Sequence, residues 1–163
     1  MAYELALVVH IVATIVGYGS TALDTVHAAR TNRFQGLEAY AVARATYSAS
    51  VKVAQPFLYL LVIAGVVAVL THPGDLTFAA PWISAAFAVY LASIGLLHGV
   101  VNRARREALV LSGSLAGEHR DAGPQSVSDL SRLGRRMVLG GIAVDLLAVI
   151  GVGLMVWQPG GNG

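Results

Sequence analysis

Long apolar stretches alternate with shorter polar stretches along this chain of 163 residues. A helix that spans a bilayer needs roughly 20 predominantly apolar residues, and four stretches reach that length. The predicted spans cover about residues 4–30, 51–71, 80–102 and 136–157. The pattern therefore predicts a single domain, residues 1–163, of the all-α class: an antiparallel four-helix transmembrane bundle with up-down-up-down topology.

The composition agrees with this membrane class. Hydrophobic residues make up 56% of the chain and charged residues only 12%, against about 25% charged in ordinary soluble domains. The chain contains no cysteine. Disulfides, thiolate nucleophiles and thiolate metal sites are therefore excluded.

Basic residues indicate the orientation. All 11 Lys and Arg residues lie in or beside the two connections 31–50 and 103–135. Under the positive-inside rule both connections are cytoplasmic loops and both termini are extracytoplasmic, in a bacterial inner (plasma) membrane. The positive charge is thus explained by topology, and no nucleic acid is expected as a partner. The cluster Arg103, Arg105 and Arg106 is expected to contact lipid headgroups.

Parts of both loops have helical patterns. Residues 36–50 are rich in Ala and predict a helix that extends the second span inward. Pro56 is expected to kink that helix. The third span is expected to continue through residues 104–111, and Ser126-x-x-Asp129 resembles a capping box at the start of the fourth.

One face of the first span is small or ionisable throughout. At helical spacing this face carries His10, Ala13, Gly17, Ser20, Asp24 and His27. Ionisable side chains are unfavourable in hydrocarbon, so this face of the helix is expected to pack toward the protein interior.

Every predicted span contributes a polar group to the inner half of the membrane: Asp24 and His27, then Gln55, His98 and Asp145. Each also has a structural interpretation. Asp24 and His27 are three residues apart and are able to pair locally. Asp145 is able to form one interhelical hydrogen bond. His98 lies between Gly95 and Gly99, a spacing that lets another helix approach closely.

Three hypotheses for function remain open. The first is a haem b site with His10, His98 and His27 as candidate ligands. His27 and His98 would flank one macrocycle. His10 would be a ligand in the outer half of the membrane, with His72 as its candidate partner. The second is a proton- or ion-coupled small transporter that uses the interior carboxylates and histidines as relays. The third is an accessory or interaction subunit of a larger membrane complex.

The known catalytic motifs are absent from the sequence. It contains no phosphate-binding nucleotide loop, no His-Glu-x-x-His zinc motif and no nucleophile elbow. The protein is therefore predicted to be non-enzymatic and to hold no metal ion outside a haem. The Gly and Ala faces of the first, third and fourth spans predict a homo-oligomer or a membrane-complex partner within the lipid bilayer.

Several short motifs carry a family resemblance. They are His10 after a leucine-rich turn, Pro81-Trp82, Arg132-Leu133-Gly134-Arg135-Arg136, and the closing Leu154-Met155-Val156-Trp157-Gln158-Pro159-Gly160. The whole chain resembles a bacterial family of four-span integral membrane proteins of unknown function. More distantly it is similar to the copper-resistance D and HemJ-type membrane proteins. The resemblance to HemJ-type proteins implies a haem ligand at His10. HemJ-type proteins also place a Trp and a basic residue after this His in the first span, and this sequence lacks both.

Overall fold

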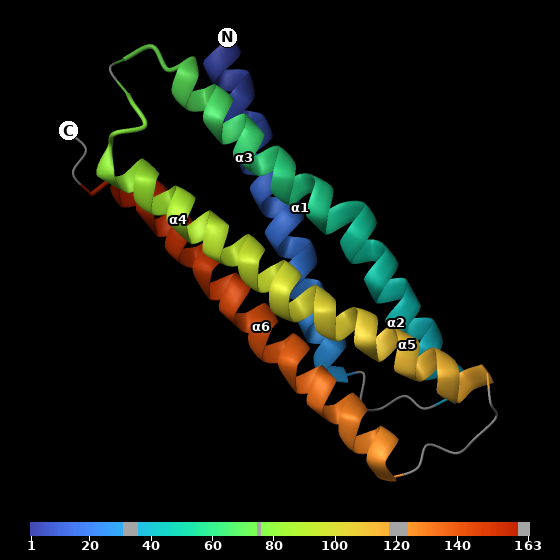
Figure 1. The fold of residues 1–163 in the computed structure, drawn as a ribbon. Helices are drawn as coiled ribbons and strands as arrows, with labels where there is room; N and C mark the ends of the chain where they lie inside the picture. The colour runs from blue at the N-terminus through green and yellow to red at the C-terminus, as the bar shows by residue number, and fades with distance from the viewer. Residues whose placement is uncertain (31–35, 75, 118–123, 160–163) are drawn as a thin grey trace.

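A computed structural model describes residues 1–30, 36–74, 76–117 and 124–159. These ranges contain helices and no strand. In chain order the elements are α1 (Ala2–Arg30), α2 (Gly36–Ala49), the π-helical turn η2 (Ser50–Ala54), α3 (Gln55–Leu70), α4 (Pro81–Leu96), the π-helical turn η3 (Leu97–Asn102), α5 (Arg103–Gly117) and α6 (Pro124–Trp157) (Figure 1).

Four continuous rods result, because η2 joins α2 to α3 and η3 joins α4 to α5 (Figure 1). Each rod is long and apolar enough to cross a membrane: Ala2–Ala29, Tyr40–Leu70, Pro81–Leu115 and Val127–Trp157. The predicted all-α bundle of four spans is therefore confirmed.

The rods are longer than the predicted spans. Residues 36–49 form α2 and residues 103–117 form α5, as the helical patterns of the two loops predicted. Helix α6 begins at Pro124, two residues before the expected cap at Ser126. Much of the sequence between the predicted spans therefore extends the membrane helices instead of forming loops.

The irregularity expected at Pro56 takes the form of η2, which ends two residues before that proline. Proline has no backbone N–H, so the helix cannot continue its regular hydrogen bonds there. The N–H of Gln55 instead reaches back five residues to the carbonyl of Ser50. Local π-helical turns of this kind often occur at functional sites.

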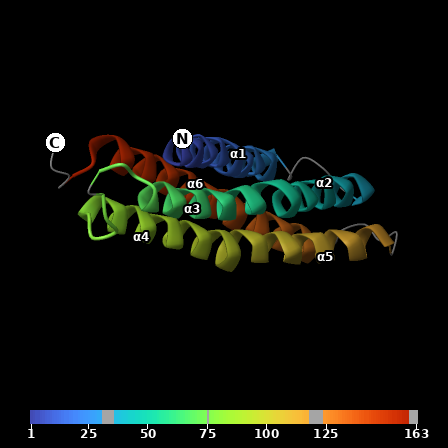
Figure 2. The same ribbon diagram turned by 90° about the horizontal axis from the view of Figure 1, so that it is seen from above.

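The rods associate as two pairs. Helix α1 packs along α3, and α4 packs along α6 (Figures 1 and 2). The pairs meet where α1 contacts α6 and, farther along, where α2 contacts α5. Over the described ranges α3 and α4 make almost no direct backbone contact, although they are consecutive spans. The two pairs consequently diverge toward one end of the bundle (Figure 1).

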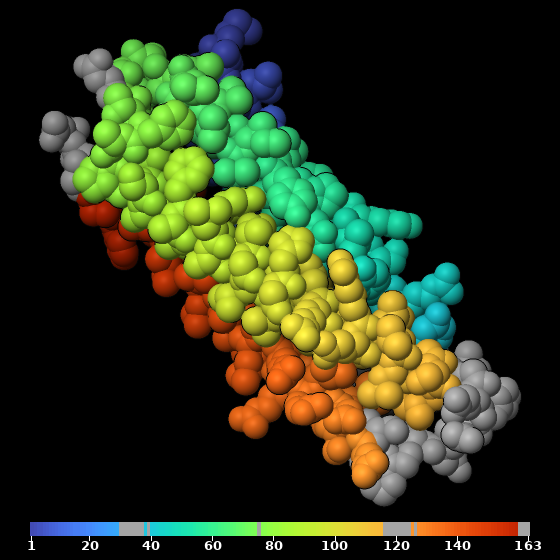
Figure 3. All heavy atoms as spheres, viewed as in Figure 1, coloured from blue at the N-terminus to red at the C-terminus, as the bar shows by residue number. Residues whose placement is uncertain are grey.

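The two ends of the molecule differ in character. The end where α1 begins and α6 finishes is called the terminal end here (Figure 1). The opposite end carries α2, α5 and the first turns of α6 and is called the arginine end (Figure 1). There the side chains of α2 and α5 meet at the surface (Figure 3).

Glycines allow close approach of the rods, both within the pairs and between them. One buried cluster, in the middle of the bundle, contains Leu58, Leu97, Val101 and Val144. A Cβ atom at Gly17 would lie 3.0 Å from the Leu58 side chain, and one at Gly140 would lie 2.8 Å from that of Val101. A Cβ atom at Gly141 would overlap Oγ1 of Thr25 on α1. Backbone approach therefore sets the distance between α1 and α3 at Gly17, between α6 and η3 at Gly140, and between α6 and α1 at Gly141.

Gly95 and Gly99 behave differently. Nothing described lies within 4 Å of a Cβ atom built at either glycine. The helix approach that their spacing predicts is therefore not made within the described part of this chain, and their face of the rod remains on the outside of the bundle.

The two kinds of glycine provide a matched stability test. Gly141→Leu is expected to lower the free energy of unfolding by about 1–3 kcal/mol, because the new side chain overpacks the contact with Thr25. Gly95→Leu is the control, and its unfolding midpoint is expected to be no lower than that of the unmodified protein. Thermal unfolding in detergent, followed by circular dichroism, measures both. Equal midpoints for the two variants would contradict the crossing described here.

Candidate functional site

A cavity of about 820 Å³ lies toward the terminal end, between the two helix pairs. This size falls within the range of about 300–1,000 Å³ that is typical of ligand pockets. Its walls come from α1, α3, α4 and α6, and the link between α3 and α4 contributes Leu76 and Thr77. We call it the terminal-end cavity. It exists because α3 and α4 are spread apart at this end.

His10 lies in the wall of this cavity. Its Nδ1 atom is 2.8 Å from the carbonyl oxygen of Leu61 on α3. A carbonyl only accepts hydrogen bonds, so Nδ1 carries the proton and the lone pair of the neutral ring is on Nε2. The absence of a side chain at Gly65 makes room for the ring, since a Cβ atom there would be 2.9 Å from Nδ1.

His72 also lines the cavity, at its terminal end. Its Nδ1 accepts a hydrogen bond of 3.0 Å from the backbone N–H of Gly74. The hydrogen of its neutral ring is therefore on Nε2. Tyr3 meets the His72 ring edge-on, with ring centroids 4.9 Å apart. His10 and His72 thus face the same space with opposite tautomers.

Aromatic side chains of α4 form part of the wall of the terminal-end cavity. Tyr90 lines the cavity and donates a hydrogen bond of 3.2 Å from its hydroxyl to the carbonyl of Leu58. This bond crosses from α4 to α3, where the backbones themselves scarcely touch. Trp82 and Phe87 add further apolar wall from α4.

A second group of polar residues lies toward the arginine end. Asp24 on α1 and Arg105 on α5 are both buried, each with about 5% of its surface exposed. Oδ2 of Asp24 is 3.1 Å from Nη2 of Arg105. Nη1 of Arg105 donates to Oγ of Ser50 on η2 at 2.5 Å. One guanidinium therefore connects three rods.

Arg105 differs from the expectation that its whole cluster contacts lipid headgroups. Arg103 and Arg106 are exposed, but Arg105 points into the bundle. The sequence did contain a signal: Asn102 and Arg105 follow His98 by four and seven residues, so the three share one helix face. The positive-inside rule accounts for all three arginines alike, so it does not distinguish the one that shares a helix face with His98 and Asn102.

Asp145 and Gln55 occupy separate positions. Asp145 on α6 is half-buried and accepts a hydrogen bond of 3.3 Å from Oγ1 of Thr21 on α1. This is the interhelical contact that its structural interpretation described. Thr21 lies one turn before Asp24, so Asp145 contacts the same face of α1 that carries Asp24. Gln55 is half-buried at the start of α3.

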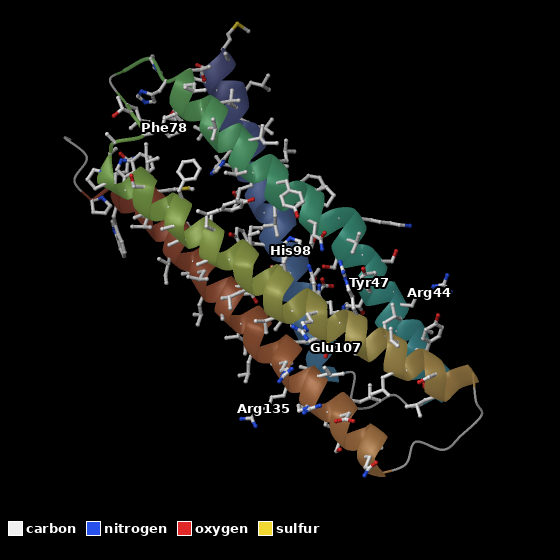
Figure 4. All side chains as sticks on the ribbon, viewed as in Figure 1. Arg44, Tyr47, Phe78, His98, Glu107 and Arg135 are labelled. Carbon is white, nitrogen blue, oxygen red and sulfur yellow. The ribbon has the colours of Figure 1, made fainter. Side chains whose placement is uncertain are left out.

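The three histidines proposed as haem ligands lie at different places in the bundle. His98 lies midway along the bundle (Figure 4) and is exposed. Its Nε2 is 2.9 Å from the hydroxyl of Tyr59, and its Nδ1 is 3.4 Å from Nδ2 of Asn102. His27 is exposed near the end of α1, close enough to Asp24 to interact with its charge. Seventeen residues separate His10 from His27, about 25 Å along a helix. Within the described chain, therefore, only His10 of the three lines the terminal-end cavity.

Asp24 and Arg105 provide a test of charge pairing. Arg105→Met is expected to cost about 3–5 kcal/mol of stability, because Asp24 is left buried without its countercharge. Adding Asp24→Leu to this variant should restore much of the loss. Arg103→Met is the control, expected to change stability by less than about 0.5 kcal/mol because Arg103 is exposed. Unfolding titrations in detergent measure all three, and a double variant no more stable than Arg105→Met would contradict the pairing.

Comparison with known proteins supplies a family. No curated protein and no solved structure matches this chain. The model of one family, described as predicted integral membrane protein (DUF2269), matches residues 4–159. That range includes three of the four spanning helices in full and all but the first two residues of the other. The chain therefore belongs to the DUF2269 family of integral membrane proteins.

Proposed function

We propose that this protein binds one molecule of haem b in the terminal-end cavity, where Nε2 of His10 would hold the iron. The observation that carries the proposal is the hydrogen bond from Nδ1 of His10 to the carbonyl of Leu61. Histidines that bind metals typically donate their other ring N–H in this way, which fixes the tautomer and the direction of the ligating nitrogen.

The rest of the cavity suits a large, flat and mostly apolar ligand. Its volume of about 820 Å³ is ample, and Trp82, Phe87 and Tyr90 supply aromatic wall. Met155 on α6 also lines the cavity, and its thioether is of a kind that would be able to hold the iron as well. Within the described lining there is no charged side chain. The polar ends of the ligand would instead meet Nε2–H of His72 together with Thr77 and Gln158, which line the cavity at the terminal end.

We also infer that the arginine end is cytoplasmic and that the protein lies in a bacterial inner membrane. All 11 Lys and Arg residues fall in or beside the two connections at that end. The terminal-end cavity would then lie in the outer half of the bilayer. When bound, haem b would supply one-electron chemistry, and the residues of this chain would orient it and exclude water.

A relay for protons has less support from the geometry. The buried Asp24 faces Arg105 at 3.1 Å, so a fixed positive charge lies on the expected route. Such a charge opposes the passage of protons and other cations. A role as a complex subunit finds its support in the face around Gly95 and Gly99, which no described residue covers.

The haem proposal is tested by absorption spectroscopy. Protein expressed with added haem precursor and purified in detergent is expected to show a Soret band and one haem per chain. His10→Ala should lose the band, because the iron loses its protein ligand. Gly65→Leu should weaken it by displacing the His10 ring.

His98→Ala is the matched control, because His98 lies outside the terminal-end cavity. It is expected to keep the Soret band at full intensity. A colourless wild-type protein, or a His10→Ala variant with an unchanged spectrum, would overturn the proposal. Loss of the band in His98→Ala alone would place the haem elsewhere in the bundle.

A further inference from the structure

Tyr59 and His98 form a polar pair on the outside of the bundle. Tyr59 on α3 is 43% exposed, and His98 on η3 is exposed beside it. Their rings are stacked, with centroids 6.2 Å apart and planes within 7° of parallel. The hydroxyl of Tyr59 is 2.9 Å from Nε2 of His98. In an integral membrane protein, a pair at this level of the bundle faces the hydrocarbon of the bilayer.

The direction of the hydrogen bond in this pair is set from inside the protein. Arg105 is able only to donate, and its Nη1 lies 3.5 Å from Oδ1 of Asn102. The amide nitrogen of Asn102 is therefore the group that faces Nδ1 of His98, at 3.4 Å. Since Nδ1 accepts, the hydrogen of the neutral ring is on Nε2 and is donated to the oxygen of Tyr59.

One hydrogen-bond donor remains at the outer end of this series of hydrogen bonds. The hydroxyl oxygen of Tyr59 accepts from His98, so the hydroxyl hydrogen is available for another partner. No described residue accepts it, since the hydroxyl contacts His98 alone among the hydrogen bonds of the described chain. A donor without an acceptor is unfavourable in hydrocarbon. Each hydrogen bond in this series also polarises the next one, which strengthens the Tyr59 hydroxyl as a donor.

The surroundings of the pair leave room for a ligand. Gly95 and Gly99 lie on either side of His98 along the rod, with nothing described within 4 Å of a Cβ atom at either. Tyr59 is eight residues beyond Val51, about 12 Å along the helix from the expected start of the span. The ester carbonyls of phospholipids lie at the edges of a hydrocarbon core roughly 30 Å thick. The donor is therefore deeper than those carbonyls.

From this geometry we propose a second ligand site, at which the Tyr59 hydroxyl donates a hydrogen bond to the carbonyl group of a lipid-soluble molecule, such as a quinone, within the hydrocarbon of the membrane. The ring of the ligand would lie against the open surface at Gly95 and Gly99. This site is independent of the terminal-end cavity and of the haem proposal. It involves binding only, without any chemical step.

The test uses infrared spectroscopy of carbonyl-labelled probes. The full chain is purified in a maltoside detergent, which has no carbonyl group. A short-tailed benzoquinone with ¹³C-labelled carbonyls is titrated in, and a phospholipid with ¹³C-labelled ester carbonyls serves as the second probe. We expect a saturable band at lowered carbonyl frequency with the quinone, at one molecule per chain, and none with the phospholipid.

Two variants test the donor and its orientation. Tyr59→Phe removes the hydroxyl and is expected to abolish the shifted band and weaken quinone binding about five- to tenfold, the effect of one hydrogen bond. Asn102→Asp is isosteric but offers His98 only acceptors. His98 would then donate from Nδ1, and Tyr59 would donate to its Nε2. This variant should lose the shifted band although Tyr59 is intact.

Tyr47→Phe is the control, since Tyr47 lies nearer the arginine end, away from His98 (Figure 4), and it is expected to keep the band. Circular dichroism and the unfolding midpoint show whether each variant is folded. The proposal is overturned if the wild type gives no shifted band, if the band appears with the phospholipid alone, or if it survives in Tyr59→Phe. It is also overturned if cross-linking shows that a second copy of the chain covers Tyr59.

Discussion

A buried ion pair determines how the two halves of this bundle meet. A carboxylate within a membrane helix must be paired or neutralised, because hydrocarbon does not solvate it. Asp24 on α1 meets Arg105 on α5, and the same guanidinium holds Ser50 at the turn between α2 and α3. These contacts, together with the approach of Gly141 to Thr25, join the α1/α3 pair to the α4/α6 pair toward the arginine end. The other end is left to spread around a cavity.

The polar groups of the interior fall into two sets with different solvation. Asp24 and Arg105 pair with each other, and the packing is dense enough that both charges are almost fully buried, although Nε of Arg105 has no hydrogen-bond partner among the described residues. In the terminal-end cavity the histidines bond to backbone groups instead, which leaves one ring nitrogen of each directed elsewhere. Tyr90 lies between the two sets and is bonded across the gap to Leu58. The arrangement separates a region that maintains the fold from a region with unused hydrogen-bonding capacity.

Much of the architecture could be predicted from the sequence, because span length, charge asymmetry and polar residues in apolar segments are local properties. Asp24, His10 and Asp145 were identifiable because hydrocarbon penalises each of them wherever it lies along its span. The partners were harder to identify. Arg105 is one of three neighbouring arginines with the same topological explanation, and its burial depends on where α5 meets α1. The partner of His10 is the backbone carbonyl of Leu61, which has no side-chain signature. The cavity arises because two helix pairs diverge. This depends on how the helices are arranged relative to one another, which the local sequence of one segment does not specify.

The separation of α3 from α4 affects how the protein is assembled during synthesis. These two rods leave the ribosome one after the other and are joined by a short link, yet each packs mainly against a helix farther away in the chain. The α1/α3 pair is complete once the second rod has been made. The third rod is able to contact α1 and α2 through Arg105 and α5, but the face of α4 that packs against α6 stays uncovered until α6 has been translated. The contacts of α6 with α1 and α4 thus form only after the last helix has been made, so the terminal-end cavity, which α6 helps to line, is the last part of the interior to be completed.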